Sequence, residues 1–292
     1  MTMQIGFIGT GTMGSGMVTN LLTGGYSVTV HNRTSDKASE LIARGAKWAT
    51  TPADAGHGAD IVITMLAHPQ AVEDMALNPE TGFLNTMKPN SIWIDCSTVN
   101  PEFARRMGQQ AQMREVGFLD APVAGSKMQA EQAQLIFFVG GESANLDICR
   151  EIFMTIGKQI NHVGEIGFGI ALKLVLNHML ATSMVAFAEG LVFGESLGLS
   201  QAVLLDTITA SAVAPPYLAG KRQKIETDQF DAEFSLRWMQ KDLQMVAETA
   251  FQTGVAMPMA NNAKEIYQLA MRYGFGDSDF SAIYAFLKGQ NE

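Results

Sequence analysis

The chain has 292 residues, of which 47% are hydrophobic, and its 20 basic and 29 acidic residues give a formal charge of −9. This length allows one large domain or two ordinary ones, with a core that needs no disulfide or metal. The acidic balance argues against a general affinity for nucleic acid or anionic membranes. The five histidines and two cysteines show no metal-ligand spacing. Cys96 and Cys149 stand in apolar runs and are interpreted as buried thiols.

Residues 1–163 alternate short β-branched runs with helical patterns. Strands are predicted at Gln4–Ile8, Ser27–His31, Ile61–Met65, Ser91–Asp95, Gly117–Ala121 and Leu135–Gly140. Helices are predicted between them at Met13–Thr23, Lys37–Arg44, Gln70–Ala76 and Pro101–Val116. Strands that alternate with helices are typical of a parallel sheet covered on both faces. The sequence therefore predicts an α/β Rossmann domain over residues 1–163.

The pattern changes after residue 163, where strand signals end. A long helix is predicted at Ile170–Leu197, followed by helices at Gln201–Ser211, Leu236–Gln252, Met259–Tyr273 and Phe280–Lys288. Residues 164–292 are therefore expected to form an all-α domain joined to the first by the long helix. Its uncharged stretch, 174–188, is shorter than the roughly 20 apolar residues of a membrane span. No signal peptide precedes the first strand, so we expect a soluble, cytoplasmic protein without membrane contact.

A glycine-rich motif, Gly9-Thr10-Gly11-Thr12-Met13-Gly14, directly follows the first predicted strand and opens a helix. In a dinucleotide fingerprint the first glycine allows a tight turn and the second lets the backbone approach the pyrophosphate. The third lets the helix pack closely on the strand. The phosphates then lie at the positive N-terminal end of the helix. This context predicts a dinucleotide site formed by the six residues.

The end of the second predicted strand indicates which dinucleotide binds. NAD enzymes usually place a carboxylate there for the ribose hydroxyls, whereas this chain has Asn32-Arg33-Thr34. Arg33 can pair with a 2′-phosphate, and Asn32 and Thr34 can donate hydrogen bonds to it. The sequence therefore favours NADP(H) over NAD(H).

Two further loops follow predicted strands and are expected to face the cofactor, because ligands bind beyond the carboxyl ends of strands in open α/β sheets. Met65 and Leu66 follow one strand, and Thr98 lies just beyond another. Met65 and Leu66 have an alternative role as core residues.

A proton donor is expected where hydride transfer builds charge on a carbonyl oxygen. Lys173 and Asn177 lie four residues apart near the start of the long helix, so they share one face of it. The neighbours of Lys173 are apolar, which suits a partly desolvated acid. A lysine whose ammonium extends to solvent is the alternative.

Together these motifs resemble the β-hydroxyacid dehydrogenase family. The resemblance runs through 6–14, the segment Asp120-Ala121-Pro122-Val123-Ala124-Gly125-Ser126, 169–177, 241–243 and 279–282. It implies a Rossmann domain followed by a helical domain that supports a homodimer or homotetramer. The roles that it implies are Lys173 as general acid/base, Ser126 and Gly125 as ligands of the substrate carboxylate, Asn177 as a substrate contact, Thr98 near the nicotinamide, and Lys241 as a cofactor contact.

Within that family the chain is most similar to the glyoxylate/succinic semialdehyde reductases, through short runs that include Gly125-Ser126-Lys127 and Phe234-Ser235-Leu236. This resemblance implies that Phe234 and Asp242 shape the substrate site. One departure is Ala124, where the family commonly has serine. The expected reaction is NADPH-dependent reduction of a small aldehyde acid to a hydroxy acid, without a metal.

Three alternatives remain at this point. The first is an NAD-dependent 3-hydroxyisobutyrate dehydrogenase that works oxidatively, against which Arg33 counts. The second is an imine reductase and the third is a non-enzymatic scaffold protein. Relatives of both latter kinds lack the lysine that this chain keeps at 173.

Overall fold

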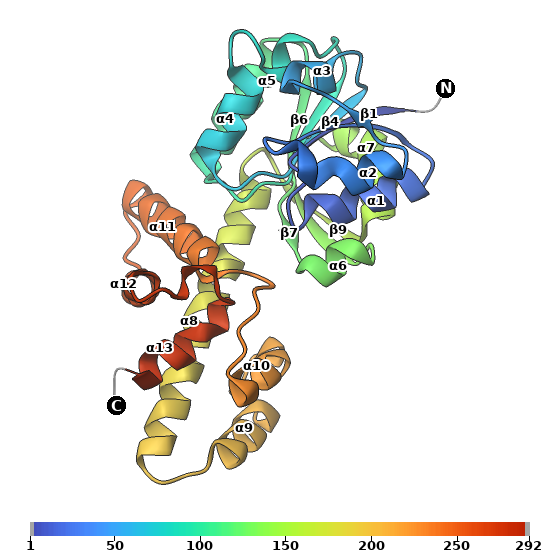
Figure 1. Cartoon of the computed structure of the whole chain (residues 1–292). Helices are drawn as coiled ribbons and strands as arrows, with labels where there is room; N and C mark the ends of the chain where they lie inside the picture. Colours follow the sequence, from blue (N-terminus) through green and yellow to red (C-terminus); the bar gives the residue numbers. More distant parts are fainter. Residues whose placement is uncertain (1–2, 290–292) are drawn as a thin grey trace. The chain divides into compact units, whose positions relative to one another are not determined.

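The computed structural model describes residues 3–289, and the chain divides into two compact units between Lys173 and Leu174 (Figure 1). The first unit contains the sheet and the second consists of helices and turns, as predicted. The boundary expected between 163 and 164 falls at the last residue of the final strand, which ends at Gly164, and the division into units lies ten residues later.

The described part of the first unit holds a nine-stranded sheet in the order β3-β2-β1-β4-β5-β6-β8-β7, with β9 paired to β8. The strands are β1 (Gln4–Ile8), β2 (Ser27–His31), β3 (Lys47–Trp48), β4 (Ile61–Thr64), β5 (Ile92–Asp95), β6 (Gly117–Asp120), β7 (Val123–Ala124), β8 (Leu135–Gly141) and β9 (Gly157–Gly164). All pairs from β3 to β6 are parallel. Their carboxyl ends therefore meet at one edge, where the glycine motif follows β1.

One side of this sheet departs from the prediction of a parallel sheet. β8 runs antiparallel to both β6 and β7, while β9 is parallel to β8. The sequence prediction also missed β3, β7 and β9. Two of these strands have only two residues, and the third, β9, is mostly polar and partly exposed. Such strands lack the apolar pattern by which strands are recognised.

Helices cover both faces of the sheet, as expected. They are α1 (Gly14–Thr23), α2 (Ser39–Ala43), α3 (Pro52–Gly56), α4 (Pro69–Leu77), α5 (Pro101–Gln112), α6 (Lys127–Glu131) and α7 (Ser143–Ile156). Side chains that alternate along a strand enter different cores. Phe7 packs in the core formed with α1 and α7, and its neighbour Ile8 packs in the core formed with α3, α4 and α5. Figure 1 shows these two helix groups on opposite faces of the sheet.

The second unit packs around the long helix α8, which begins within the first unit. The helices are α8 (Phe168–Ser196), α9 (Gln201–Ala210), α10 (Arg222–Thr227), α11 (Leu236–Thr253), α12 (Pro258–Arg272) and α13 (Ile283–Gly289), with short 3-10 turns η3 (Pro216–Lys221), η4 (Phe275–Asp277) and η5 (Phe280–Ala282). By length and composition alone α8 could cross a membrane, with a mean hydropathy of 1.6 in its most apolar window. A core helix of a soluble protein has the same properties, and Ala181, Met184 and Leu191 of α8 are fully buried in the core of this unit.

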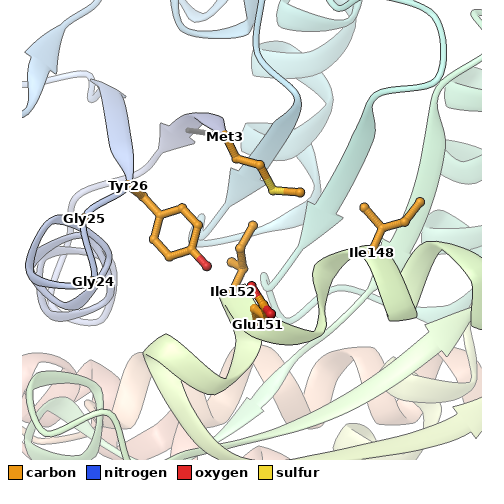
Figure 2. A pocket seen from close by; sticks show the side chains of 7 residues that line it. All are labelled: Met3, Gly24, Gly25, Tyr26, Ile148, Glu151 and Ile152. Atoms are coloured by element: carbon orange, nitrogen blue, oxygen red, sulfur yellow. The ribbon is translucent and has the colours of Figure 1, made fainter. Parts of the chain in front are cut away.

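A hollow of about 310 Å³ lies in the first unit between the turn after α1 and the surface of α7 (Figure 2). Met3 and Tyr26, which precede β1 and β2, form part of its wall together with Ile148, Glu151 and Ile152. The hollow is therefore at the amino ends of these strands. The glycine motif follows the carboxyl end of β1, so this hollow is not the predicted nucleotide site.

Candidate active site

Two glycines of the motif are required by the fold itself. Gly9 has a φ of +104°, and a Cβ atom there would collide with the carbonyl oxygen of Met65 in the loop after β4. A Cβ atom at Gly14 would collide with the carbonyl oxygen of Gly9. These contacts let the loop and the start of α1 pack closely against the sheet.

Gly11 and Thr10 are not constrained in this way. Gly11 leaves room for a ligand, and Thr10 offers a polar atom to it. A Cβ atom at Gly11 would meet no atom within 4 Å. Thr10 is buried, yet its hydroxyl has no hydrogen-bond partner in the described part of the chain. The side chain of Met13, at the start of α1, also makes no capping hydrogen bond. This loop therefore offers an open backbone and a positive helix end to an anionic group.

Asn32 braces this loop from the end of β2. The backbone N–H of Thr10 donates to Oδ1 of Asn32 over 3.2 Å, and Nδ2 of Asn32 donates to the carbonyl of Thr34 over 2.9 Å. Arg33 and Thr34 are exposed. The sequence prediction gave Asn32 a hydrogen bond to a 2′-phosphate. In the structure its Oδ1 holds the loop and its Nδ2 donates to Thr34, so its contact with a 2′-phosphate stays a prediction. Arg33 is the exposed cation beside it.

The loops after β4 and β5 are linked to each other by a chain of hydrogen bonds. The N–H of Leu66 donates to Oγ of Ser97 over 2.9 Å, and the N–H of Ser97 donates to Oδ1 of Asp95 over 3.0 Å. Met65 and Leu66 also pack partly buried against the two cores, which agrees with their alternative role as core residues, and their contact with the cofactor stays a prediction. The sequence prediction placed the loop of Ser97 and Thr98 at the cofactor but missed Asp95, although Asp95 is a carboxylate at a strand end.

Ser126 begins α6 with its hydroxyl directed to a neighbour. Its Oγ lies 2.6 Å from Oε1 of Gln129 and donates to it, and its backbone N–H donates to the same oxygen over 2.8 Å. Gly125 has a φ of +129°, a conformation that favours glycine. Gln129 therefore orients the serine that was predicted to hold a carboxylate, and sequence reasoning did not single it out.

Asn177 and Asp242 form a buried pair in the helical unit. Nδ2 of Asn177, on α8, donates to Oδ2 of Asp242, on α11, over 2.6 Å. Nζ of Lys241 lies 3.0 Å from Oδ1 of the same carboxylate, an ion pair without hydrogen-bond geometry. Asp242 was expected to shape the substrate site, and here it orients Asn177. Lys173 precedes Asn177 by four residues in α8, so both lie on one face of that helix.

Phe234, which was also expected to shape the substrate site, packs partly buried against the core of the helical unit. It precedes α11, and its ring packs against Phe280 with 5.9 Å between ring centroids. The backbone N–H of Phe280 donates to the carbonyl of Phe234 over 2.9 Å. The residues of the described chain contain no cluster of three or more histidine, cysteine or acidic side chains suited to a metal ion.

Comparison with known proteins agrees with this arrangement in both units. Residues 4–164 match the NAD-binding domain of 6-phosphogluconate dehydrogenase, and residues 167–287 match the NAD-binding model of NADP-dependent 3-hydroxyisobutyrate dehydrogenase. Glyoxylate/succinic semialdehyde reductase 1 of Arabidopsis thaliana is 34% identical, over 99% of this chain and 100% of its own. The chain belongs to the β-hydroxyacid dehydrogenase family.

Two further proteins similar to this β-hydroxyacid dehydrogenase are an enzyme of known structure and a nuclear factor. The 3-hydroxyisobutyrate dehydrogenase of Mycobacterium tuberculosis, solved with L-serine, superposes with a TM-score of 0.89 at 31% identity, covering 99% of this chain and 100% of its own. The cytokine-like nuclear factor N-PAC of Xenopus tropicalis is 35% identical over 96% of this chain. The chain spans about half of that relative, 52% of its length.

The family assignment confirms the predicted Rossmann fold, the oxidoreductase class and NADP(H) as cofactor. The residues in the first unit fit this cofactor. The open space at Gly11, the unpartnered hydroxyl of Thr10 and the uncapped start of α1 suit a pyrophosphate, and Arg33 supplies a cation at the end of β2.

Proposed function

We propose that this β-hydroxyacid dehydrogenase reduces small aldehyde acids, glyoxylate and succinic semialdehyde first among them, to the corresponding hydroxy acids. The observation that carries the proposal is the pair Lys173 and Asn177 on one face of α8, with Asn177 oriented by a buried carboxylate. The similarity to the Arabidopsis reductase over the whole of both chains favours these substrates.

The residues have distinct roles in the proposed reaction. Bound NADPH supplies the hydride that adds to the carbonyl carbon. Lys173 donates a proton to the oxygen on which negative charge develops, and it recovers that proton from solvent afterwards. Asn177 binds beside the same oxygen. Asp242 accepts from Nδ2 of Asn177 and thereby fixes the orientation of its amide. Ser126 and the backbone N–H of Gly125 bind the substrate carboxylate, with Ser126 held by Gln129.

The test follows NADPH absorbance with glyoxylate, succinic semialdehyde and methylmalonate semialdehyde in turn. We expect fast oxidation of NADPH with either of the first two acids and slow oxidation of NADH. Lys173→Ala should lower kcat by roughly 10²- to 10⁴-fold, because a positioned general acid contributes about that much. Its Kd for NADPH, measured by fluorescence titration, should stay close to that of the unmodified enzyme.

Lys158→Ala is the matched control, since Lys158 is an exposed lysine of β9 in the same unit. It should keep the full kcat. Turnover by Lys173→Ala equal to that of the control would exclude Lys173 as the acid. Preference for NADH, or for the branched aldehyde, would instead favour the 3-hydroxyisobutyrate dehydrogenase alternative. The similarity to the mycobacterial enzyme is consistent with that alternative. The cytoplasmic location and the homodimer or homotetramer stay predictions, to be checked by cell fractionation and by light scattering.

A further inference from the structure

Asp120 is the last residue of β6, and its buried carboxylate points at the beginning of α8. The backbone N–H of Gly167 donates to Oδ1 over 2.7 Å, and the N–H of Ile170 donates to Oδ2 over 2.8 Å. The first turn of a helix has N–H groups without partners inside the helix. Asp120 supplies two of these partners from a strand that is 47 and 50 residues away in the sequence.

Glycines on three sides allow this close approach. Gly169 lies in the first turn of α8, and a Cβ atom there would collide with the carbonyl oxygen of Phe138 and lie 2.9 Å from Oδ2 of Asp120. A Cβ atom at Gly140, the partner of Asp120 across the sheet, would collide with Oδ1. Gly167 has a φ of +92°, which favours glycine. The carboxylate and the helix therefore approach more closely than a Cβ atom at Gly140 or Gly169 would allow.

We infer that Asp120 is a positioning residue that fixes the first turn of α8 and, through it, the catalytic side chain of Lys173. Lys173 follows Ile170 by three residues, which is less than one helical turn, so a shift of the first turn moves it directly. Asp120 also begins the segment that leads to Ser126. One side chain thus links the proton donor to the carboxylate-binding segment. This inference rests on the proposed function, which gives Lys173 and Ser126 their roles.

The electrostatic setting gives this contact a measurable signature. Burial raises the pKa of Asp120 to about 6, against the lowering effect of the hydrogen bonds from Gly167 and Ile170, and Asp95 on the neighbouring strand raises it further. Among the charged residues near this contact, Nε of Arg105 lies beside Gly167. Glu165 stands two residues before Gly167 in the turn ahead of α8, and Lys173 follows Ile170 by three residues. Protonation of the carboxylate weakens its acceptance of the two N–H groups. Activity should therefore fall as the pH drops through about 6.

Asp120→Asn tests the inference because it keeps the shape and removes the charge. An amide can accept from only one of the two N–H groups, and its own NH₂ then faces the other. We expect kcat to fall by about 10- to 100-fold, in the range known for small misplacements of a catalytic group. The Kd for NADPH should change less than about two-fold, and the decline of kcat/KM near pH 6 should disappear.

Asp60→Asn is the matched control, since Asp60 also accepts a backbone N–H, from Gln4 over 2.8 Å, but at the amino end of the sheet. It should keep the kcat of the unmodified enzyme. Gly169→Ala is the second variant, because its methyl group pushes α8 away while the carboxylate stays intact, and it should lower kcat in the same way. A full kcat and an unchanged pH profile in Asp120→Asn would overturn the inference.

Hydrogen exchange separates this inference from the proposed function. The amides of Gly167 and Ile170 should exchange faster in Asp120→Asn than in the unmodified protein, whereas they should be unchanged in Asp60→Asn. Equal protection in all three proteins refutes the anchor even if the enzyme is active. Failure of the unmodified enzyme to reduce any aldehyde acid refutes the proposed function, and Lys173 is then no longer the group that Asp120 positions.

Discussion

The two units each bury a carboxylate almost completely, but they stabilise it in different ways. In the helical unit, Asp279 lies 3.0 Å from Nζ of Lys221 and accepts the hydroxyl of Ser281 over 2.7 Å. In the NADP-binding unit, Asp120 accepts backbone N–H groups at the start of α8, and no lysine or arginine in the described residues forms an ion pair with it. The carboxylate of Asp279 is therefore stabilised by a cation, and that of Asp120 by the N–H groups at the start of a helix.

The difference indicates what each carboxylate does. Asp279 also accepts from the backbone N–H of Phe234 over 3.4 Å and from that of Glu233 over 3.2 Å, so it holds the segment before α11 in place. Because Asp279 pairs with Lys221 and binds only groups of its own unit in these contacts, this clamp contributes mainly to the fold. Asp120 keeps its charge at a cost in stability, as its raised pKa shows. This costly charge lies at the start of the proposed catalytic helix, which agrees with a role in function rather than in stability.

The largest effect on stability is expected when the ion pair between Lys221 and Asp279 of the helical unit is broken. Lys221→Met removes the cation and leaves Asp279 buried without its partner, which should cost about 3–5 kcal/mol in the free energy of unfolding. Urea unfolding followed by circular dichroism measures it. The double variant Lys221→Met/Asp279→Asn removes both charges and should recover part of the loss. A cost below about 1 kcal/mol for the single variant would show that the pair behaves like an exposed one.

A smaller effect concerns the pH dependence of stability that Asp120 causes. Its pKa of about 6 in the folded protein exceeds its ordinary value of 3.8, so the folded state binds the proton more tightly. This contribution stabilises the fold fully below pH 3.8 and is lost as the pH rises through 6. The unmodified protein should lose up to about 3 kcal/mol relative to Asp120→Asn over that window.

Urea unfolding of both proteins at several pH values between 4 and 7 measures this loss, and a constant difference between them would contradict it. Asp60→Asn should show the opposite dependence of stability on pH. The hydrogen bond from the backbone of Gln4 and that from Lys88 hold the pKa of Asp60 below its usual value, so this carboxylate contributes stability that is lost as the pH falls.

The smallest expected effect belongs to a pair with good geometry at the surface. Arg106 contacts Glu73 through both of its terminal nitrogens, one of them at 2.8 Å, and both side chains are partly exposed. Glu73→Gln should change the free energy of unfolding by less than about 1 kcal/mol, because solvent screens such pairs. The urea midpoint measures it. A loss as large as that of Lys221→Met would mean that burial does not explain the difference between the pairs.

The sequence predicted those parts of the fold that have a local signal. The glycine motif, the buried parallel strands and the long helix were all found, because short-range pattern determines them. The helix α7 was missed although Leu146, Cys149, Ile152, Phe153 and Ile156 recur at helical spacing. The polar strand β9 has no such signal. The antiparallel direction of β8 follows from tertiary packing, which no local pattern encodes.

The candidate site shows the same limit. Arg33, Lys173 and the glycines were chosen from local context or family resemblance. The partner of Asn177 is 65 residues away in the sequence, and the partners of Asp120 are 47 and 50 residues away. Contacts of that separation depend on how whole elements pack. Sequence reasoning could name such residues but not the atoms to which they bind.

The three glycines of the motif at residues 9–14 are under different structural constraints. Gly9 and Gly14 are fixed by contacts inside the protein, whereas Gly11 faces open space and is needed only where a ligand approaches. A descendant of this chain that kept its fold but abandoned its cofactor would retain the first and third glycines and be free to vary the second. The residue at position 11 is therefore a sequence marker that separates selection for folding from selection for binding.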